Sequence, residues 1–152
     1  MESLATSILS RLDLNQSREP SLRNSSTSPR RTRALLSIRP PYAEAIFQGE
    51  KRFEFRRAIF RRPVNVVVVY VTSPICLVAG EFDVVGIISD EVRRLWSRTG
   101  HSAGIEKELF FDYFSGCATA HAIEIGDVRR YVRPLELASS FGVRPPQSFV
   151  YV

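Results

Sequence analysis

Short apolar runs, separated by turn-forming residues, follow one another from position 34 to the end of the chain. The segment 66–71 is apolar at every position, which is typical of a strand covered on both faces in the middle of a sheet. In the segment 51–57, Phe53 and Phe55 alternate with charged residues, and this period of two predicts a half-buried strand. One side of that strand is expected to face the core and the other to carry charges.

Five further segments have the composition of strands, which gives six or seven short strands in all. The segment 78–88 is the longest of them, and Gly80 and Gly86 within it predict bends or β-bulges. We therefore expect one long, curved strand there. The remaining strands are expected at 35–38, 120–125, 131–132 and 148–152.

Two or three short helices are expected between these strands. Tyr42 and Ile46 lie at helical spacing behind a double proline, and Gly49 is expected to end this first helix. Asp90 is a candidate N-cap for a second helix that reaches Trp96. A third helix is predicted over 105–114 by the cluster of Leu109, Phe110, Tyr113 and Phe114 on one face.

The order of these elements predicts the fold class. Helices are inserted among the strands and do not alternate with them strictly, which disfavours a doubly wound parallel sheet. The pattern favours an α+β fold, a small, mixed, closed or nearly closed β-barrel of six or seven strands with two or three short helices.

Residues 1–33 differ from the rest of the chain. They hold eight serines, six arginines and three acidic residues, with no aromatic residue, and we expect a disordered tail before a domain at 34–152. The tail carries three of the five net positive charges of the chain. An arm that binds nucleic acid and an extension that only aids solubility both fit this composition.

Composition limits what this chain of 152 residues does. The longest apolar run has six residues, far fewer than the roughly 20 needed to span a bilayer, so no membrane partner is expected. Two cysteines and two histidines without zinc-binding spacing predict no metal site and no cofactor. The start of the chain lacks the features of a secretory signal, which favours a cytoplasmic location. The pI near 9.7 corresponds to a net positive charge, which is expected of a protein that binds polyanions.

The segment 49–62, GEKRFEFRRAIFRR, holds six cations and only two acidic residues, and Arg39 stands shortly before it. A solvated basic strand has the same composition. The spacing is more specific, because Gly49, Lys51, Glu54 and Arg56 match the motif GxKxxExR.

This motif resembles that of the ASCH domain family, within the PUA-like superfamily. The resemblance continues in order through LLSIRPPYAEAIF, VYVTSP, VAGEFDV, ELFFDYF and PPQSFVYV, and so covers residues 35–152. These segments stand in the same order as in the ASCH proteins often labelled predicted transcriptional regulators. The resemblance implies a PUA-like barrel with a cleft beside the first helix and second strand, where RNA, a nucleotide or a modified nucleoside binds. A role in regulating transcription or translation would follow from that.

Several residues give this implied site its chemistry. Gly49 allows close approach of a ligand to the backbone, and the Lys51 ammonium could meet a phosphate or a carbonyl. Glu54 and Arg56 could pair with each other, or hold a base amine and a phosphate respectively. Strict alternation puts Lys51 and Glu54 on opposite sides, unless the turn after Gly49 distorts the start of the strand.

Polar residues at strand ends complete the expected binding site. They could hydrogen-bond a base edge, although turn chemistry explains them equally well. Aromatic residues could stack on a base or belong to the core; these are Tyr42, Trp96 and Tyr151. The expected binding residues are Gly49, Lys51, Glu54, Arg56, Arg39, Thr72, Ser73, Gln147 and Ser148.

A small hydrolase is the alternative, acting on a modified nucleoside or on RNA. Some ASCH proteins resemble amidohydrolases that use a motif lysine, a threonine three residues later and a glutamate on a later strand. The matching positions here are Lys51, Glu54 and Glu81, and the missing hydroxyl at position 54 removes that nucleophile. Lys51 with a lowered pKa could still activate water while a glutamate moves the proton. A protein-interaction domain with an incidental basic strand is the third possibility.

Overall fold

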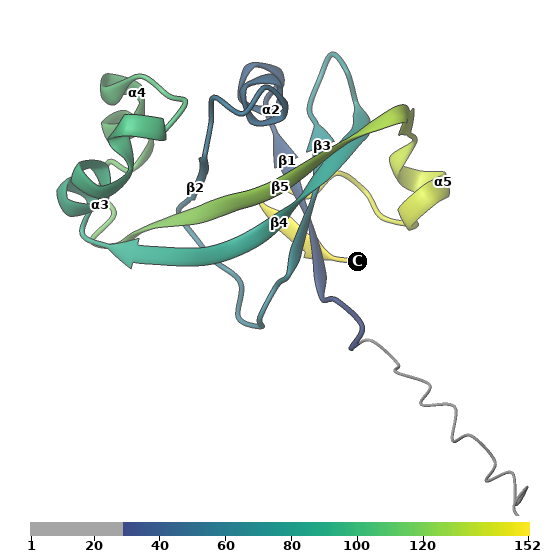
Figure 1. Ribbon diagram of the computed structural model, residues 1–152, viewed down its shortest axis with the longest axis horizontal. Helices are drawn as coiled ribbons and strands as arrows, with labels where there is room; N and C mark the ends of the chain where they lie inside the picture. The colour runs from purple at the N-terminus through teal and green to yellow at the C-terminus, as the bar shows by residue number, and fades with distance from the viewer. Residues whose placement is uncertain (1–28) are drawn as a thin grey trace, which may run out of the picture. The chain divides into compact units, whose positions relative to one another are not determined.

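A single six-stranded sheet forms the body of the domain in the computed structural model, which describes residues 29–152 (Figure 1). The expected tail at 1–33 lies almost entirely outside the described residues. The strand order is β2-β5-β4-β3-β1-β6; β1 and β3 are parallel and all other neighbours antiparallel. The strands are β1 (Arg33–Ile38), β2 (Phe53–Arg56), β3 (Val66–Val71), β4 (Leu77–Asp90), β5 (Ala120–Leu135) and β6 (Phe149–Tyr151).

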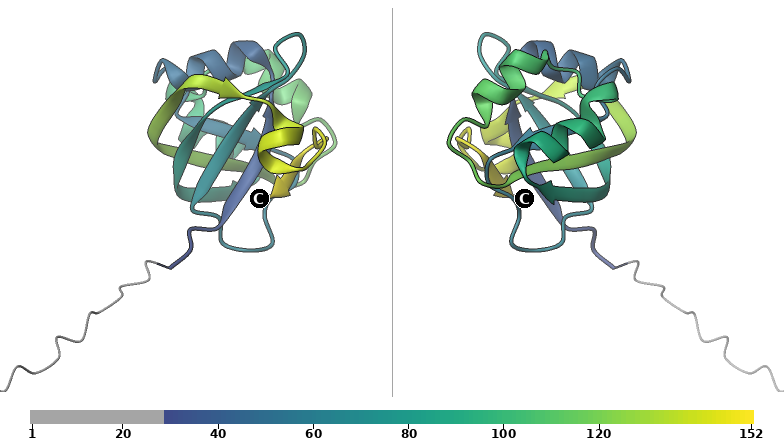
Figure 2. Two further views of the ribbon diagram at one scale, coloured as in Figure 1. Left: turned by 90° about the vertical axis from the view of Figure 1, so that its right-hand side faces the viewer. Right: turned by 90° about the vertical axis from the view of Figure 1, so that its left-hand side faces the viewer.

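The sheet curls on itself like an incomplete barrel (Figure 2). Within the described residues it carries four helices, α2 (Pro40–Phe47), α3 (Val92–Thr99), α4 (Lys107–Tyr113) and α5 (Leu137–Phe141), and the 3₁₀ turn η1 (Gly100–Ser102). Helices α3 and α4 lie at one end of the long β4–β5 ribbon and α5 at the other (Figure 1). This confirms the α+β mixed barrel. Two or three helices were expected, and the additional one is α5. It was not predicted because its five residues are too few to show a helical period.

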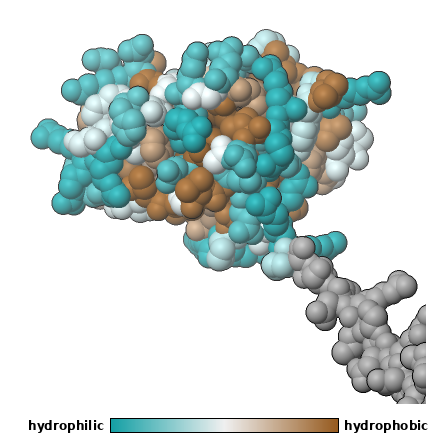
Figure 3. All heavy atoms as spheres, in the orientation of Figure 1, coloured by the Kyte–Doolittle hydropathy of each residue, from teal (hydrophilic) through white to brown (hydrophobic). Residues whose placement is uncertain are grey.

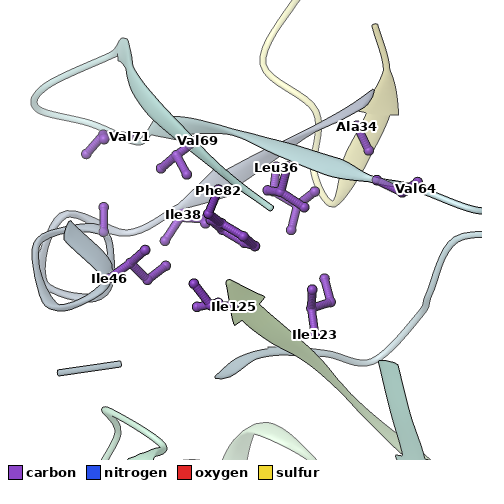
Figure 4. Packing of buried hydrophobic residues seen from close by; sticks show 12 residues of the cluster. Ala34, Leu36, Ile38, Ile46, Val64, Val69, Val71, Phe82, Ile123 and Ile125 are labelled. Atoms are coloured by element: carbon purple, nitrogen blue, oxygen red, sulfur yellow. The ribbon is translucent and has the colours of Figure 1, made fainter. Parts of the chain in front are cut away.

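Strand β3 is central, as its composition predicts. All six of its residues are buried, and it pairs with β1 on one side and β4 on the other. The side chains of one of its faces meet Phe82, Ile123, Ile125 and Ile46 of α2 in the main core cluster (Figure 4); they are Val67, Val69 and Val71. Apolar residues also reach the surface, where they group among hydrophilic ones on the face shown in Figure 3.

In the long β4–β5 ribbon, strand β4 agrees with the sequence-based expectation and strand β5 differs from it. Strand β4 is long and carries three register shifts, at Val78/Gly80, Phe82/Val84 and Val84/Gly86, which confirms the predicted bulges. Strand β5 is one continuous strand where the pattern predicted two short ones. Its middle, at 126–130, has Val128 as its only apolar side chain, but the backbone of residues 128–130 pairs with β4 regardless of side-chain polarity.

The start of α3 also differs from the expectation. The N-cap is Glu91 and not Asp90, because the Glu91 carboxylate accepts hydrogen bonds from the N–H groups of Arg93 and Arg94 at 3.1 and 3.2 Å. Asp90 accepts one from the N–H of Glu91 instead, at 2.7 Å. In the described part of the chain, no helix is long and apolar enough to cross a membrane.

The barrel should depend on Phe82, whose side chain is fully buried in the main core cluster. We expect Phe82→Ala to lower the free energy of unfolding by about 3–5 kcal/mol, because it removes buried apolar area and leaves a cavity. Urea denaturation measures this. Val132→Ala is the control, since Val132 is 99% exposed and should leave the midpoint unchanged. A loss below about 1 kcal/mol in Phe82→Ala would contradict the assignment of this core.

Candidate binding pocket

The turn after α2 sets the position of Lys51. Gly49 has φ +79°, and the N–H groups of Glu50 and Lys51 both donate to the carbonyl of Ala45 at 3.0 Å. Strand β2 then begins only at Phe53, so strict alternation does not apply to Lys51. The Lys51 Nζ lies 3.9 Å from Glu54 Oε2, and the two groups therefore share one site.

Lys51 is almost completely buried, with 2% of its surface exposed. Its Nζ donates a hydrogen bond of 2.8 Å to the carbonyl of Ala103, in the segment between η1 and α4. The ring centroids of Phe55 and Tyr42 lie 4.8 and 5.3 Å from the ammonium. Burial lowers the pKa of Lys51, and the negative charge of Glu54 acts in the opposite direction. The amine is thus easier to deprotonate than that of an exposed lysine.

Strand β2 is buried on both sides, which corrects the half-buried strand predicted from its alternation. Phe53 and Phe55 pack against a second core cluster that includes residues of α3 and α4. On the other side, Glu54 and Arg56 are also buried, because distant segments cover them. The Arg56 guanidinium donates to Glu54 Oε1 at 3.3 Å and to the carbonyl of Ser148 at 2.7 Å.

Lys51, Glu54 and Arg56, called the charged row below, form part of the wall of a pocket of about 820 Å³. Four parts of the chain surround it: the end of β1 with the start of α2, β2 with the loop after it, α4, and the segment before β6. The lining residues are Ser37, Ile38, Arg39, Tyr42, Lys51, Glu54, Phe55, Arg56, Arg57, Ala58, Ile105, Leu109, Asp112, Tyr113, Gln147 and Ser148.

The structure brings six of the expected binding residues to this pocket and leaves four candidates outside. Those that line it are Arg39, Lys51, Glu54, Arg56, Gln147 and Ser148, and those that do not are Gly49, Thr72, Ser73 and Glu81. Of the aromatic candidates, Tyr42 lines the pocket, whereas Trp96 packs against Phe110 and Tyr151 lies under Arg62.

Glu81 belongs to a separate ionic network. Its carboxylate accepts hydrogen bonds from Arg33 at 2.7 Å, Arg129 at 3.0 Å and the Tyr131 hydroxyl at 2.8 Å. Although burial acts to raise it, these hydrogen bonds lower the pKa of Glu81. Burial and the bond to Glu81 together raise the pKa of Tyr131 to about 12. This network ties β1 to the β4–β5 ribbon.

The sequence reasoning did not identify the α4 wall of the pocket. Leu109 is 51% exposed and Tyr113 39% exposed, although the sequence placed both on one face of this helix with Phe110 and Phe114. Exposed large apolar side chains beside the buried Phe110 and Phe114 indicate a binding surface. This exposure is visible only in the structure and not in the sequence. Burial, reinforced by the charge of Glu54, raises the pKa of the Tyr113 hydroxyl against the effect of Arg56.

The pocket combines an excess of positive charge with aromatic surface. Its lining holds four cations and two carboxylates, Glu54 and Asp112. Tyr42 and Tyr113 stand at its α2 and α4 walls. Such a site can hold an anionic group beside a planar ring. Within residues 29–152, no group of three or more His, Cys, Asp or Glu side chains is placed to hold a metal ion.

Gly104 packs directly against the Lys51 side chain. It has φ +63°, and a Cβ added there would come within 2.6 Å of the Lys51 Cγ. The N–H of Arg52 also donates to the carbonyl of Ser102 at 2.9 Å, which fixes this segment against the motif. The segment at 102–104 therefore determines where the Lys51 side chain lies.

Gly104→Ala should displace Lys51. Left-handed backbone costs a non-glycine residue about 1–2 kcal/mol, and the contact with Lys51 adds to that. Gly142→Ala is a matched control, because Gly142 has φ +65° and a Cβ there meets nothing within 4 Å. We expect Gly104→Ala to lower the unfolding free energy more than Gly142→Ala, and to shift the NMR signal of Lys51. Equal losses, with an unchanged Lys51 signal, would show that the contact does not position the amine.

Comparison with known proteins gives the family. The family model described as the ASCH domain matches residues 36–133. The "ASCH domain-containing ribonuclease" of Zymomonas mobilis is 33% identical over 129 residues, which cover 82% of this chain and 86% of the relative. The crystal structure of ASCH from Zymomonas mobilis has a TM-score of 0.73 at 32% identity, covering 79% of this chain and 87% of that one. The structure of a tyrosine-to-phenylalanine mutant of ZmASCH has a TM-score of 0.74 at 31% identity, covering 80% and 91%. The chain therefore belongs to the ASCH domain family, as its GxKxxExR motif predicted.

Proposed function

We propose that this ASCH domain binds single-stranded RNA and takes one nucleotide of it into the pocket. The observation that carries the proposal is the charged row on the pocket wall, in which two buried cations accompany one buried carboxylate. An anionic ligand would neutralise the remaining positive charge. The name of the Zymomonas mobilis relative, a ribonuclease, supports RNA as the ligand class.

The walls of the pocket fit a nucleotide. Lys51 and the exposed Arg39 and Arg57 offer charge to a phosphate, whereas most donors of Arg56 are occupied by Glu54, Ser37 and Ser148. Tyr42 and Tyr113 contribute aromatic side chains to the lining. Proteins recognise single-stranded RNA by stacking unpaired bases on aromatic side chains, whereas paired bases are not accessible in this way.

Arg39→Ala should weaken RNA binding through the loss of one phosphate contact. Arg39 is exposed at the pocket and forms no ion pair within the described residues, so the fold should be unaffected. For single strands, the slope of log affinity against log salt should become less negative by about 0.7. Titration of a labelled oligouridylate at several salt concentrations measures the slope.

Arg93→Ala is the control for Arg39→Ala, since Arg93 is exposed on α3 and does not line the pocket. It should leave the slope unchanged. Salt-independent binding by the unmodified protein would contradict the proposal, because phosphate contacts release counterions. It would favour the protein-interaction alternative.

The second candidate function is hydrolysis of RNA or of a modified nucleoside. The observation that favours it is the buried Lys51 amine, 3.9 Å from the Glu54 carboxylate. In its neutral form the amine would accept a proton from the RNA 2′-hydroxyl or from water, and the nearby arginines would stabilise negative charge on the attacked group. Glu81 does not line the pocket, so this proposal depends on Lys51 and Glu54 alone.

Cleavage and binding should depend on pH in opposite directions. The pKa of Lys51 is lowered, so the amine loses its proton at a lower pH than an ordinary lysine. As pH rises through that pKa, cleavage should increase because the base is neutral, and anion binding should decrease because a charge is lost. Lys51→Arg stays protonated and should lower the single-turnover cleavage rate about 10²- to 10⁴-fold while keeping binding.

The chain contains one other lysine, Lys107, which is exposed on α4. Lys107→Arg is therefore the matched control, and selective labelling of lysine gives two NMR signals from which the pKa of Lys51 can be titrated. Cleavage that is retained in Lys51→Arg, or that does not follow the titration of Lys51, would exclude Lys51 as the base. Absence of cleavage by the unmodified protein would remove the hydrolase proposal and leave the binding proposal intact.

Three further expectations from the sequence stay proposals. These are a role in regulating transcription or translation, a location in the cytoplasm, and the division into a tail at 1–33 and a domain at 34–152. An RNA-binding domain is compatible with each of them.

A further inference from the structure

The loop between β2 and β3 is strongly basic. From position 57 to position 65 it contains Arg57, Arg61 and Arg62 and no acidic residue. All three arginines are exposed, and none is within 4.0 Å of a carboxylate in the part of the chain that the structure describes. By contrast, Arg33, Arg129 and Arg130 elsewhere on the sheet are all paired with glutamates.

This loop is held against the last strand. The Arg62 guanidinium carbon lies 3.7 Å from the centroid of the Tyr151 ring, and the N–H of Arg61 donates to the Tyr151 hydroxyl at 3.1 Å. Phe60 packs edge-to-face on Phe149, with centroids 4.9 Å apart. The arginines are therefore presented from a fixed backbone, which lowers the entropy lost when they bind a ligand. The edge of the stacked Arg62 guanidinium stays available to a phosphate.

The loop begins at the pocket and leads away from it. Arg57 and Ala58 line the pocket, and so does Ser148, which directly precedes β6. Tyr151 follows Ser148 by three residues, or about 10 Å along an extended strand. Figures 1 and 2 show the loop and the C-terminal strand at the same end of the barrel. Basic residues therefore continue from the pocket wall to the stacked pair of Arg62 and Tyr151.

We infer that this loop is a second binding site for the RNA strand whose nucleotide occupies the pocket. Phosphates next to that nucleotide contact Arg57, Arg61 and Arg62, with the guanidinium of Arg62 oriented by Tyr151. The preferred ligand is then a single-stranded oligonucleotide and not a free nucleotide. This inference rests on the proposed function, because it assigns a path to a strand that the pocket is proposed to bind.

The test compares two probes, uridine monophosphate and hexauridylate, on the full chain. The double variant Arg61→Ala/Arg62→Ala should bind hexauridylate about tenfold more weakly at about 50 mM salt, with a slope less negative by about 1.4 for two lost contacts. Its affinity for the mononucleotide should not change. The control, Arg93→Ala/Arg133→Ala, removes the same charge at exposed positions away from the loop and should not change either affinity. Thermal unfolding of both variants confirms that they are folded.

The outcomes separate this inference from the function on which it rests. If the unmodified protein binds neither probe, the loop site and the proposed RNA-binding function are both contradicted. If it binds hexauridylate but the loop variant keeps the affinity and slope, or if the control pair loses as much, only the loop site is overturned. Equal affinity of the unmodified protein for the two probes also overturns it. The loop site is also overturned if oligoglutamate binds and loses as much affinity in Arg61→Ala/Arg62→Ala, since the loop would then recognise negative charge and not RNA.

Discussion

The charged row of Lys51, Glu54 and Arg56 imposes the strongest constraint on this domain. Removing a charge from water costs several kcal/mol unless the group is paired and hydrogen-bonded. Two cations and one carboxylate are buried here, on the short edge strand β2 and two residues before it, and each has partners. Within residues 29–152, no fully buried side-chain nitrogen or oxygen lacks a hydrogen-bond partner.

Those partners come from segments that are distant in the sequence. The carbonyl of Ala103, between η1 and α4, accepts from Lys51, and the carbonyl of Ser148, before β6, accepts from Arg56. The Ser37 hydroxyl, at the end of β1, donates to the carbonyl of Pro146 at 2.6 Å and so holds the same C-terminal segment. Satisfying the charged row thus assembles three walls of the pocket. The stability of the domain and the geometry of the site depend on the same contacts.

Much of the fold follows from local pattern. The uniform apolar run at 66–71 predicted the central strand, and the glycines at 80 and 86 predicted the bulges of β4. The errors fall where tertiary pairing overrides local preference. The polar residues Arg129 and Arg130 stay in β5 because β4 offers them backbone partners. Helix α5 is too short to show a period.

The sequence by itself determined the family, the central strand and the first helix with its glycine. Only the tertiary structure decided that both sides of β2 are buried, that Lys51 and Glu54 face one pocket, and that Glu81 lies outside it. The physical reason is that alternation reports polarity along one strand, whereas burial depends on what covers it. The residues that cover the strand are many positions away from the motif, and the spacing of the motif does not predict them; they are Ala103, Tyr113 and Ser148.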